Sequence, residues 1–354
     1  MLSMNMPSTR AEPIDAAGSG EVDEARQSPR MSLPAWRVSV APMMGYTDRH
    51  FRYLLRLISP NTALYTEMVT ANALLHRGPG IIALDEGQGH TALQLGGSEP
   101  DDLARCAALA EAEGYTELNL NVGCPSPRVS KGRFGACLMA EPTLVAECVA
   151  AMRSASRLPV TVKCRLGIDA FDDDPFLHRF VDAVRPHIDG LVVHARIALL
   201  EGLSPEENRE IPPLQYPRVH ALRERCPTLP VAINGGIRSM DDARRELALN
   251  DGVMLGRAIC ANPSLLGELD AQFLGGPRTD DAVVLDGYVD YMHRELERGT
   301  PFTAMARRTL GLFTGVPGAR RFRREVTVLC HEGCRDPERI RAAGARLPMD
   351  PAAA

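Results

Sequence analysis

Hydrophobic residues recur in short runs along most of the chain, and each run ends in small or polar residues. Segments with helical spacing of apolar residues lie between the runs, for example 100–114, 141–155 and 239–249, and they begin with proline, acidic residues or serine. The eight runs that we predict as strands are 38–44, 63–69, 91–97, 117–124, 159–167, 190–196, 230–236 and 252–258. Eight alternations of strand and helix predict an α/β fold of the (β/α)8 TIM-barrel type. A doubly wound sheet also alternates, but it rarely reaches eight near-regular units, and no Gly-x-Gly-x-x-Gly follows the first run.

From about residue 280 the pattern becomes helical throughout. Residues 286–299 and 302–315 have the spacing of amphipathic helices. Residues 1–34, by contrast, are polar and rich in proline, serine, glycine and acidic residues, which is typical of a disordered extension. We therefore divide the chain into a disordered extension (1–34), a TIM barrel (35–278), a smaller all-helical domain (279–345) and a tail (346–354).

The composition of the 354 residues, 45% hydrophobic and 24% charged, is ordinary for a soluble globular protein. No apolar run reaches the roughly 18 residues of a membrane span, and the N-terminus does not resemble a secretory signal. The chain has nine scattered cysteines, which favours the reducing environment of the cytoplasm. We also expect the protein to be a monomer. Cys330 and Cys334 form the one close pair, but zinc would need two more ligands nearby, so we expect no metal site.

The formal net charge of −5 does not suggest a nucleic-acid-binding protein, but it hides an asymmetry. Between residues 291 and 346 there are twelve arginines and six acidic residues, so this segment carries +6 and the rest of the chain −11. A basic segment on an acidic body indicates an anionic partner for that segment. A bundle of helices with solvated arginines has the same composition, so charge alone leaves both interpretations open.

Chemistry in a TIM barrel is expected at the C-terminal ends of the strands, where active sites of this fold lie. The polar or functional residues at these ends are Met43, Met44, Glu67, Gln94, Asn119 to Cys124, Lys163, Arg165, His194, Arg196, Asn234 to Gly236, Gly256 and Arg257. Any one of them could be incidental, but their convergence on one mouth predicts a functional site.

The last two strand ends favour a phosphate-binding site. TIM barrels often bind phosphate with the loops after strands seven and eight. Gly235 and Gly236 permit a close approach of the backbone there, and Arg257 adds positive charge. A Gly-Gly pair alone also makes ordinary turns, so this prediction depends on the two adjacent loops together.

Lys163 lies within the fifth strand, where a charged side chain is costly to bury without an anionic partner. Either a carboxylate such as Glu67 or the electron-rich edge of a cofactor would supply one. His194, at the end of the next strand, is either structural or part of the same site. A phosphate site combined with Lys163, Gln94 and His194 suits FMN, with Lys163 at the N1/O2 edge of the flavin and Gln94 on its polar rim.

The segment LNLNVGCPSPRVSKGRFGACLM, residues 118–139, places Cys124 on a Gly-Cys-Pro turn after the fourth strand. A thiol, with an unperturbed pKa of about 8.5, can protonate one carbon while hydride reaches the next. A nucleophile, a redox sensor and a buried small hydrophobic residue are the alternatives. The turn favours exposure, so we interpret Cys124 as a general acid. Arg128, Lys131 and Arg133 follow it as a basic strip suited to a nucleic-acid backbone.

These segments resemble the flavin-dependent tRNA-dihydrouridine synthases. The matching stretches are 40–56, 64–76, 92–107, 118–139, 202–214, INGGI, DGVMLGRA and 310–324, and the likeness covers roughly residues 36–325. The pattern is most similar to the bacterial A-type subfamily, which reduces uridines 20 and 20a of the tRNA D-loop. The chain beyond about residue 326 and the extension 1–34 do not share the likeness, so no role is transferred to them.

The resemblance implies a role for each part of the barrel mouth. Cys124 would protonate C5 of the uracil while reduced FMN delivers hydride to C6, and NADPH would reduce the flavin in a separate half-reaction. Residues implied in flavin binding are Pro42, Met43 and Met44 along the ring, Gln94, Lys163 and His194 at its polar edge, and Asn234, Gly235, Gly236, Gly256 and Arg257 at the phosphate.

For the tRNA, the resemblance implies contacts in both parts of the chain. Asn121 and Arg209 correspond to positions near the uracil, and Glu206 to one that helps to orient the tRNA. The helical domain would bind tRNA phosphates, mainly through Arg320, Arg321, Arg323 and Arg324. The target base would have to be flipped out to reach the mouth.

Two other functions are consistent with parts of the sequence. A barrel flavoenzyme that reduces a free pyrimidine, as dihydroorotate-type dehydrogenases do, would not need the basic helical domain. A tRNA-binding chaperone without catalysis would not need Cys124, Lys163 and the phosphate loops.

Overall fold

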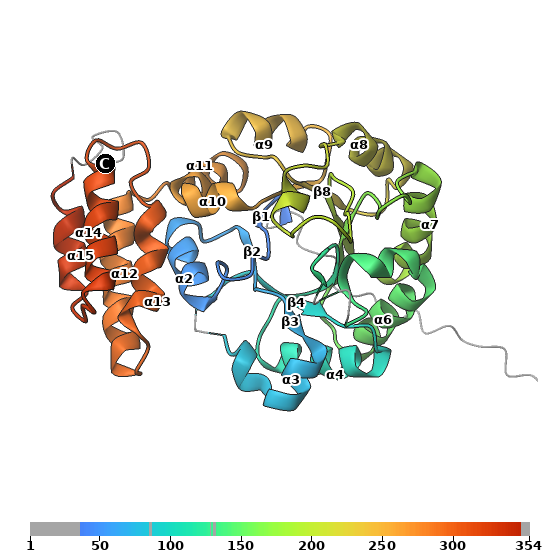
Figure 1. Ribbon diagram of the computed structural model, residues 1–354, viewed down its shortest axis with the longest axis horizontal. Helices are drawn as coiled ribbons and strands as arrows, with labels where there is room; N and C mark the ends of the chain where they lie inside the picture. The colour runs from blue at the N-terminus through green and yellow to red at the C-terminus, as the bar shows by residue number, and fades with distance from the viewer. Residues whose placement is uncertain (1–35, 85–86, 128, 130–131, 348–354) are drawn as a thin grey trace, which may run out of the picture.

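The computed structural model describes residues 36–84, 87–127, 129 and 132–347. The predicted extension 1–34, most of the tail, and Arg128 and Lys131 of the basic strip lie outside this range. The described part consists of a barrel and a helical module beside it (Figure 1). The change between them falls in the segment 274–280, and the exact domain boundaries stay a prediction.

Eight parallel strands close into a barrel, as predicted. They are β1 (Val38–Val40), β2 (Ala63–Tyr65), β4 (Thr91–Gly96), β5 (Glu117–Val122), β6 (Val160–Arg165), β7 (Gly190–His194), β8 (Val231–Asn234) and β9 (Gly252–Leu255). Each strand pairs with the next, and β9 pairs back to β1, so the barrel has no open edge. The short β3 (Val69–Thr70) adds a ninth segment against the end of β4. Each of the eight predicted runs contains one of the barrel strands.

Helices surround the barrel (Figure 1). They are α2 (Arg49–Ile58), α3 (Ala71–Arg77), α4 (Pro100–Ala112), α6 (Pro142–Ala155), α7 (Asp174–Val184), α8 (Tyr216–Arg225), α9 (Met240–Leu247), α10 (Arg257–Ala261) and α11 (Ser264–Phe273). The three helices expected at 100–114, 141–155 and 239–249 are confirmed. Ser239 caps α9, because its hydroxyl accepts a hydrogen bond from the Asp242 N–H at 3.1 Å.

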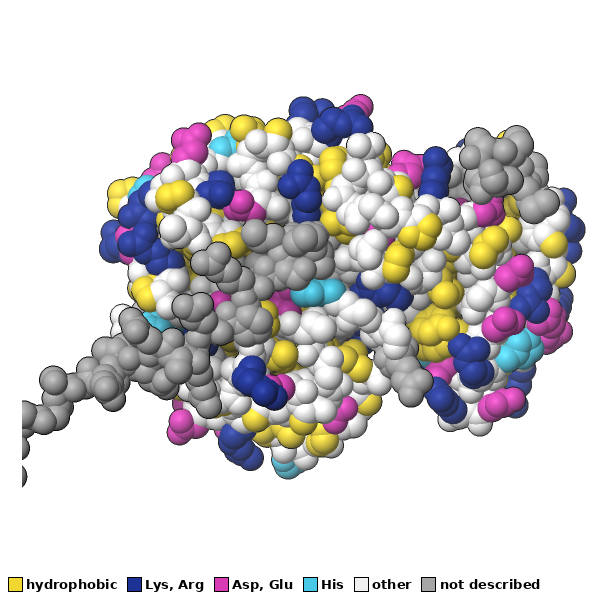
Figure 2. All heavy atoms as spheres, turned by 180° about the vertical axis from the view of Figure 1, so that it is seen from behind, with side chains coloured by type: hydrophobic (Ala, Val, Ile, Leu, Met, Phe, Trp, Pro, Cys, Tyr) yellow, Lys and Arg dark blue, Asp and Glu magenta, His cyan; other side chains and the backbone are white. Residues whose placement is uncertain are grey.

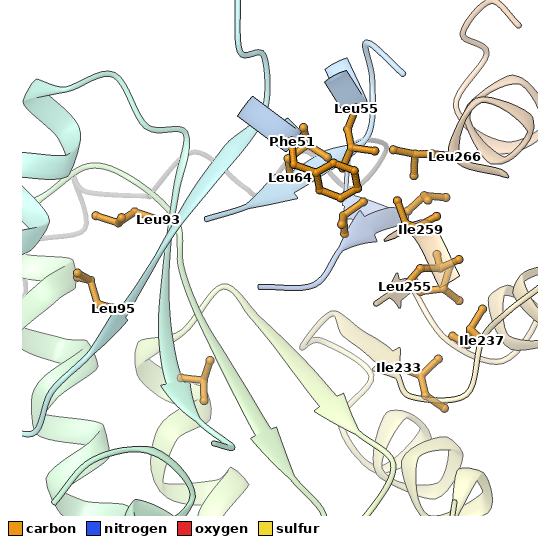
Figure 3. Close-up of a cluster of buried hydrophobic side chains, with 14 of the residues drawn as sticks. Phe51, Leu55, Leu64, Leu93, Leu95, Ile233, Ile237, Leu255, Ile259 and Leu266 are labelled. Atoms are coloured by element: carbon orange, nitrogen blue, oxygen red, sulfur yellow. The ribbon is translucent and has the colours of Figure 1, made fainter. Parts of the chain in front are cut away.

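Two cores follow from the alternation of side chains along each strand. Outward-facing residues pack against the helices, as Figure 3 shows for Leu93 and Leu95 of β4, Ile233 of β8 and Leu255 of β9. A smaller apolar cluster fills part of the barrel interior. Its members are Trp36 and Ala41, on either side of β1, and Ala63, Tyr65, Ala92, Val192, Ala232 and Met254, from β2, β4, β7, β8 and β9.

The helical module contains α12 (Asp281–Glu297), α13 (Phe302–Ala306), a 3-10 turn (Arg307–Gly311), α14 (Ala319–His331) and α15 (Glu338–Gly344). The single helix predicted for 302–315 is wrong, because α13 ends at Ala306 and the chain turns, with a φ of 61° at Phe313. Packing against the barrel explains the break. A Cβ on Gly311 would lie 2.6 Å from the Cys260 carbonyl oxygen of α10, so the backbones touch there. Among the described residues, no helix is long and apolar enough to cross a membrane.

The module docks on α2 of the barrel through aromatic and ionic contacts. The Tyr53 and Tyr291 rings stack with their centroids 3.9 Å apart. Arg49 forms an ion pair with Glu295, whose side chain is fully buried. Arg308 donates to the Gly45 carbonyl oxygen at 2.9 Å and pairs with Asp48. The last contact connects the helical module directly to the loop that follows β1.

Candidate functional site

Polar side chains occupy the half of the barrel interior formed by β4, β5 and β6. On β5 the alternation in ELNLNV turns Glu117, Asn119 and Asn121 inward, while the intervening leucines and valine pack outward. Gln94 on β4 lies beside Asn119, its pair in the strand register, and donates to the Asn119 side-chain oxygen at 2.7 Å. Both amide side chains are almost fully buried. The polar interior therefore continues upward into the residues at the mouth.

Asn121 holds the turn that carries Cys124, residues 121–125, which we call the cysteine turn. The Asn121 side-chain oxygen accepts hydrogen bonds from the N–H groups of Gly123 (3.1 Å) and Cys124 (3.0 Å), and its amide nitrogen donates to Gln94 at 2.8 Å. Cys124 is half-buried at the C-terminal end of β5. The proposed alternative of a fully buried small hydrophobic residue is therefore wrong.

The rest of the cysteine turn is fixed by close backbone packing. The Ala136 N–H donates to the Cys124 carbonyl oxygen at 3.0 Å, and Arg165 donates to the Gly123 carbonyl oxygen at 3.1 Å. Gly135 has a φ of 80°, and a Cβ there would lie 2.7 Å from the Cys124 carbonyl oxygen. Only glycine fits this position without displacing the turn.

Positive side chains gather around the mouth. The Lys163 ammonium donates to the Asn234 side-chain oxygen at 3.0 Å, and burial lowers the pKa of Lys163 to about 8, with a further contribution from the nearby Arg165 charge. Glu67 instead accepts a hydrogen bond from the Gly45 N–H, so the Lys163–Glu67 pair that we considered is not formed. Burial also lowers the pKa of Arg165 to about 10.

His194 lies among these cations at the end of β7. Burial lowers the pKa of His194 well below its usual value, and the charges of Arg165, Lys163, Arg196 and Arg209 lower it further. The ring is therefore neutral at pH 7 and keeps one donor and one acceptor nitrogen. This result also shows that Arg209, exposed in the loop after β7, is near the mouth.

The two glycines after β8 form a cradle that no other residue would fit. Gly235 and Gly236 have φ values of 106° and 74°. A Cβ on Gly235 would lie 2.6 Å from the His194 ring, and one on Gly236 would lie 2.5 Å from Leu214. The Gly235 carbonyl oxygen accepts from the Tyr216 hydroxyl at 2.7 Å. Because neither glycine has a side chain, the backbone of this loop can approach a ligand closely.

Beside the cradle, Gly256 precedes the short helix α10, whose first residue is Arg257. Arg257 forms an ion pair with Glu210 at 2.6 Å, and both side chains are exposed. Arg196 lies nearby with its Nε buried and without a hydrogen-bond partner in the part of the chain that the structure describes. A bound anion would satisfy this donor.

The loop after β1 lies beside the loop after β9, because β1 pairs with β9 and a Cβ on Gly256 would lie 3.8 Å from the Met43 sulfur. Pro42 and Met43 are half-buried, and the Met43 N–H donates to the Thr47 hydroxyl at 2.9 Å. Met44 and Tyr46 expose 65% and 52% of their surface. Large apolar side chains are also exposed in loops after other strands, at Phe171, Ile211 and Leu214. Apolar surface at several strand ends suits a flat, partly apolar ligand.

Apart from the buried Asn121 and the partly exposed Arg323, the residues predicted from sequence to bind tRNA lie at exposed positions. Glu206 precedes a short 3-10 turn (Glu207–Arg209) that ends at Arg209, and the buried Asn208 holds this turn to Leu199. Arg133 of the basic strip pairs loosely with Glu141, at 3.6 Å.

On α14, Phe322, Val326 and Leu329 face inward, whereas Arg320 and Arg324 are exposed and Arg323 is partly exposed.

Many arginines of the helical module are paired with acidic residues. Figure 2 shows basic and acidic side chains interspersed over this module, and Arg341 alone contacts three carboxylates. Arg320, Arg323 and Arg324 differ, because none of them has an ion pair with any described residue. A hollow between α14 and α15 is lined by Arg321, Arg324, Arg339, Arg346 and Glu325, among others.

Sequence reasoning missed several residues of the site. Glu117, Thr161 and Asn208 hold other site residues, Glu210 pairs with Arg257, and Arg308 anchors the β1 loop. The period of two in ELNLNV could have indicated Glu117 as an inward residue. The sequence has no comparable signal for the others.

Within the described residues there is no group of three or more His, Cys, Asp or Glu side chains that could hold a metal ion.

Comparison with known proteins agrees with this geometry. The dihydrouridine synthase (Dus) family matches residues 39–338. The chain is 50% identical over 309 residues to the tRNA-dihydrouridine(20/20a) synthase of Salmonella typhimurium, covering 86% of this chain and 93% of that protein. The enzymes of the same name from Vibrio cholerae and Escherichia coli K12 are 49% and 48% identical, covering 88% and 90% of this chain and 97% and 95% of theirs.

Among solved structures, morphinone reductase in complex with tetrahydroNAD has a TM-score of 0.44 at 14% identity, over 70% of this chain and 90% of that one, and this likeness is too weak to bear on function. The family match, in contrast, spans the barrel and most of the helical module, and half of the residues are shared with relatives of nearly the same length. The chain belongs to the dihydrouridine synthase family.

Proposed function

We propose that this protein reduces the C5=C6 bond of uridines 20 and 20a in the D-loop of tRNA, with FMN as hydride carrier and NADPH as reductant. The observation that carries the proposal is the identity of about 50%, over 86–90% of the chain, to relatives that bear the name tRNA-dihydrouridine(20/20a) synthase. Because the substrate is tRNA, the enzyme would work in the cytoplasm, and we expect it to act as a monomer.

The residues at the mouth fit a flavin with a phosphate. Lys163 is largely buried, and its hydrogen-bond partner among the described residues is a neutral amide, so a flavin would supply the anionic partner that its burial requires. The orphaned Arg196 Nε and the cradle of Gly235 and Gly236 supply donors and close backbone approach for a phosphate. The remaining residues that would hold the group are Pro42, Met43, Met44, Gln94, His194, Asn234, Gly256 and Arg257.

When bound, FMN would supply the hydride, and NADPH would restore it. The protein's own part is to orient the uracil and to provide a proton at C5. Cys124 would donate that proton, because it is half-buried on a turn fixed by Asn121 and lies beside the cations of the mouth. Asn121 and the exposed Arg209 would contact the uracil or the nucleotides beside it.

Recognition of tRNA would rely on α14. Arg320 and Arg324 are separated by one helical turn, so their like charges repel. Arg320 also lies in the first turn of the helix, which contains no acidic residue and where the helix dipole disfavours positive charge. Both costs are relieved by a phosphate backbone bound against this face, together with Arg323 and the neighbouring Arg321. Glu206 would help to set the orientation of the tRNA at the mouth.

The proposal is tested by mass spectrometry of dihydrouridine at positions 20 and 20a in unmodified tRNA incubated with the purified yellow enzyme and NADPH. We expect both positions to be reduced by the wild type. Cys124→Ala should retain FMN and tRNA binding but lose the product, whereas Cys334→Ala, a half-buried thiol of the helical module, should behave as wild type. A colourless protein that FMN does not reconstitute, or full turnover by Cys124→Ala, contradicts the proposal. Reduction of free uridine or orotate but not tRNA would favour the small-pyrimidine alternative.

A further inference from the structure

An unbroken chain of side-chain hydrogen bonds crosses the barrel interior and ends at the cysteine turn. The Thr161 hydroxyl donates to Glu117 Oε1 at 2.6 Å and accepts from the Asn119 amide nitrogen at 2.8 Å. The Asn119 oxygen accepts from Gln94 at 2.7 Å, and the Gln94 oxygen accepts from Asn121 at 2.8 Å. Asn121 in turn accepts from two N–H groups of the cysteine turn. The chain therefore runs from Glu117, at the start of β5, to the strand end that carries the cysteine.

The direction of every bond in this chain is fixed by its ends. Backbone N–H groups can only donate, so Asn121 must turn its oxygen toward the cysteine turn. At the other end, the Trp36 indole N–H can only donate to the Tyr65 hydroxyl, at 3.0 Å. The Tyr65 hydroxyl in turn donates to Glu117 Oε1 at 2.5 Å. Glu117 Oε1 accepts from both the Tyr65 and the Thr161 hydroxyls, so the bonds from both sides converge on Glu117.

Burial strengthens this constraint. Glu117, Asn119, Thr161 and Tyr65 have no measurable exposure, so water does not offer them alternative partners. A buried polar group that loses its partner bears the full cost of its desolvation. Burial and the Glu117 charge raise the pKa of Tyr65 well above its usual value, which keeps its proton in place as a donor.

We propose that Glu117 is a positioning residue that sets the orientation of the Asn119, Gln94 and Asn121 amides through Thr161, and thereby holds Cys124 in place. The inference rests on the proposed function for its effect on uridine reduction. With this orientation, the oxygen of Asn121 faces the cysteine turn, and one hydrogen of its amide nitrogen is left over after the bond to Gln94. Asn121 would thus present a donor to a uracil carbonyl.

The reversed orientation has two consequences that make it unfavourable. If the Asn121 amide turned over, its NH2 group would face the N–H groups of Gly123 and Cys124, and both would lose their acceptor. Gln94 and Asn119 would then have to turn over as well, and Asn119 would present an oxygen to Thr161, whose hydroxyl proton is held by Glu117. The four side-chain hydrogen bonds between Glu117 and Asn121, which run through Thr161, Asn119 and Gln94, are therefore expected to form or to be lost together.

Two substitutions, Thr161→Val and Glu117→Leu, break the series of hydrogen bonds at its Glu117 end. Thr161→Val keeps the shape of the side chain but removes the hydroxyl, and Thr161→Ser should restore most of what Thr161→Val loses. Glu117→Leu removes the acceptor itself and serves as a second variant. Thr91→Val, at a fully buried outward position of β4, is the control for the first substitution.

The control for Glu117→Leu is Glu246→Leu. Glu246 on α9 is also buried and also pairs with a histidine, His220, at 2.9 Å, just as Glu117 pairs with His90 at 3.0 Å. It lies outside the barrel interior, so its removal tests the loss of a buried carboxylate–histidine pair without an effect on the chain of bonds.

The first readout needs neither tRNA nor NADPH. The alkylation rate of Cys124 by iodoacetamide, resolved by peptide mass spectrometry on the enzyme as purified, should change at least threefold in Thr161→Val and Glu117→Leu. The rate at Cys334 in the same sample serves as the reference. The rates should be unchanged in Thr91→Val and Glu246→Leu. This measurement remains valid if the protein turns out not to act on tRNA, so failure of the proposed function and failure of the inference are distinguishable.

The second readout is reduction of tRNA. We expect the single-turnover rate of dihydrouridine formation to fall at least tenfold in Thr161→Val and Glu117→Leu, with the KM for tRNA changed by less than threefold. The double variant Glu117→Leu/Thr161→Val should be no slower than the slower of the two single variants, because both substitutions break the same series of hydrogen bonds. Additive losses, an unchanged Cys124 alkylation rate in folded Thr161→Val, or a loss of rate in the controls as large as in the variants would each overturn the inference.

Discussion

Lys163 should make the flavin-free protein less stable at neutral pH, and its replacement by methionine should stabilise that form. The pKa of Lys163 is lowered from 10.5 to about 8 in the folded protein. One pKa unit corresponds to about 1.36 kcal/mol, so the protonated lysine costs up to about 3 kcal/mol of the free energy of unfolding below pH 8. This is an upper value, since part of the side chain remains exposed to solvent.

The sign of the pH dependence follows from proton counting. Between pH 8 and 10.5 the unfolded chain binds more protons at Lys163 than the folded chain does, so this residue makes stability rise with pH across that window. Below pH 8 both states are protonated and the cost is constant. Lys163→Met removes the dependence but leaves the Asn234 oxygen without its donor, which costs about 1 kcal/mol. The expected net gain at pH 7 is therefore about 2 kcal/mol.

The assay is urea unfolding of the flavin-free wild type and Lys163→Met at pH 7, 8, 9 and 10. The difference in the free energy of unfolding should be about 2 kcal/mol in favour of the variant at pH 7 and should shrink or reverse by pH 10. FMN should reverse the order at pH 7, because only the wild type offers the ligand a buried cation. The reasoning is refuted if the variant is less stable than the wild type at pH 7 without flavin, or if the two proteins have parallel pH profiles.

Three further predictions concern the loops and the helical module. Gly235→Ala should lower FMN affinity at least tenfold and destabilise the protein by about 1 to 3 kcal/mol, measured by flavin fluorescence and urea unfolding, because its Cβ would lie 2.6 Å from His194. Neutralising Arg320 and Arg323 together should weaken tRNA binding and reduce the slope of log affinity against log salt by about 1 to 2, measured by filter binding. Arg308→Ala should free the β1 loop from the helical module and speed proteolysis between α11 and α12, with a loss of about 1 to 3 kcal/mol of stability.

Each of these has a matched control. Gly114 has a φ of 87° in open space, so Gly114→Ala carries similar backbone strain without a collision and should leave FMN affinity unchanged. Replacing the exposed Arg105 and Arg179 of the barrel helices changes the net charge equally and should not alter the salt slope. Arg298→Ala removes an exposed arginine from the same docking surface and should cost less than Arg308→Ala. Equal effects in a variant and its control contradict the corresponding prediction.

The sequence by itself determined the barrel. Period-two alternation within strands and 3.6-residue periodicity within helices are local properties of the chain, so the eight strands and the three best-marked helices are predicted from sequence. The predicted strands begin within one residue of the observed ones but end up to four residues too late, at β1 and β2. Gly235 and Gly236 are predicted from their place directly after the seventh strand, and the structure gives both of them a positive φ. Cys124 is a candidate from sequence because its turn directly follows a strand.

The sequence was insufficient to predict features that depend on contacts between segments far apart in the chain. The break after α13 depends on contact between Gly311 and α10, about fifty residues earlier in the chain. The partner of Lys163 is Asn234 and not Glu67, which no local pattern distinguishes.

Only the tertiary structure decided how the mouth is held. Glu117, Thr161 and Gln94 come from three different strands and meet because the barrel closes in one register. Arg308 reaches the β1 loop across more than 250 positions of sequence. Hydrogen bonds of this kind depend on where strands and helices are placed relative to one another, and that placement is fixed by packing of the whole core and not by any segment alone.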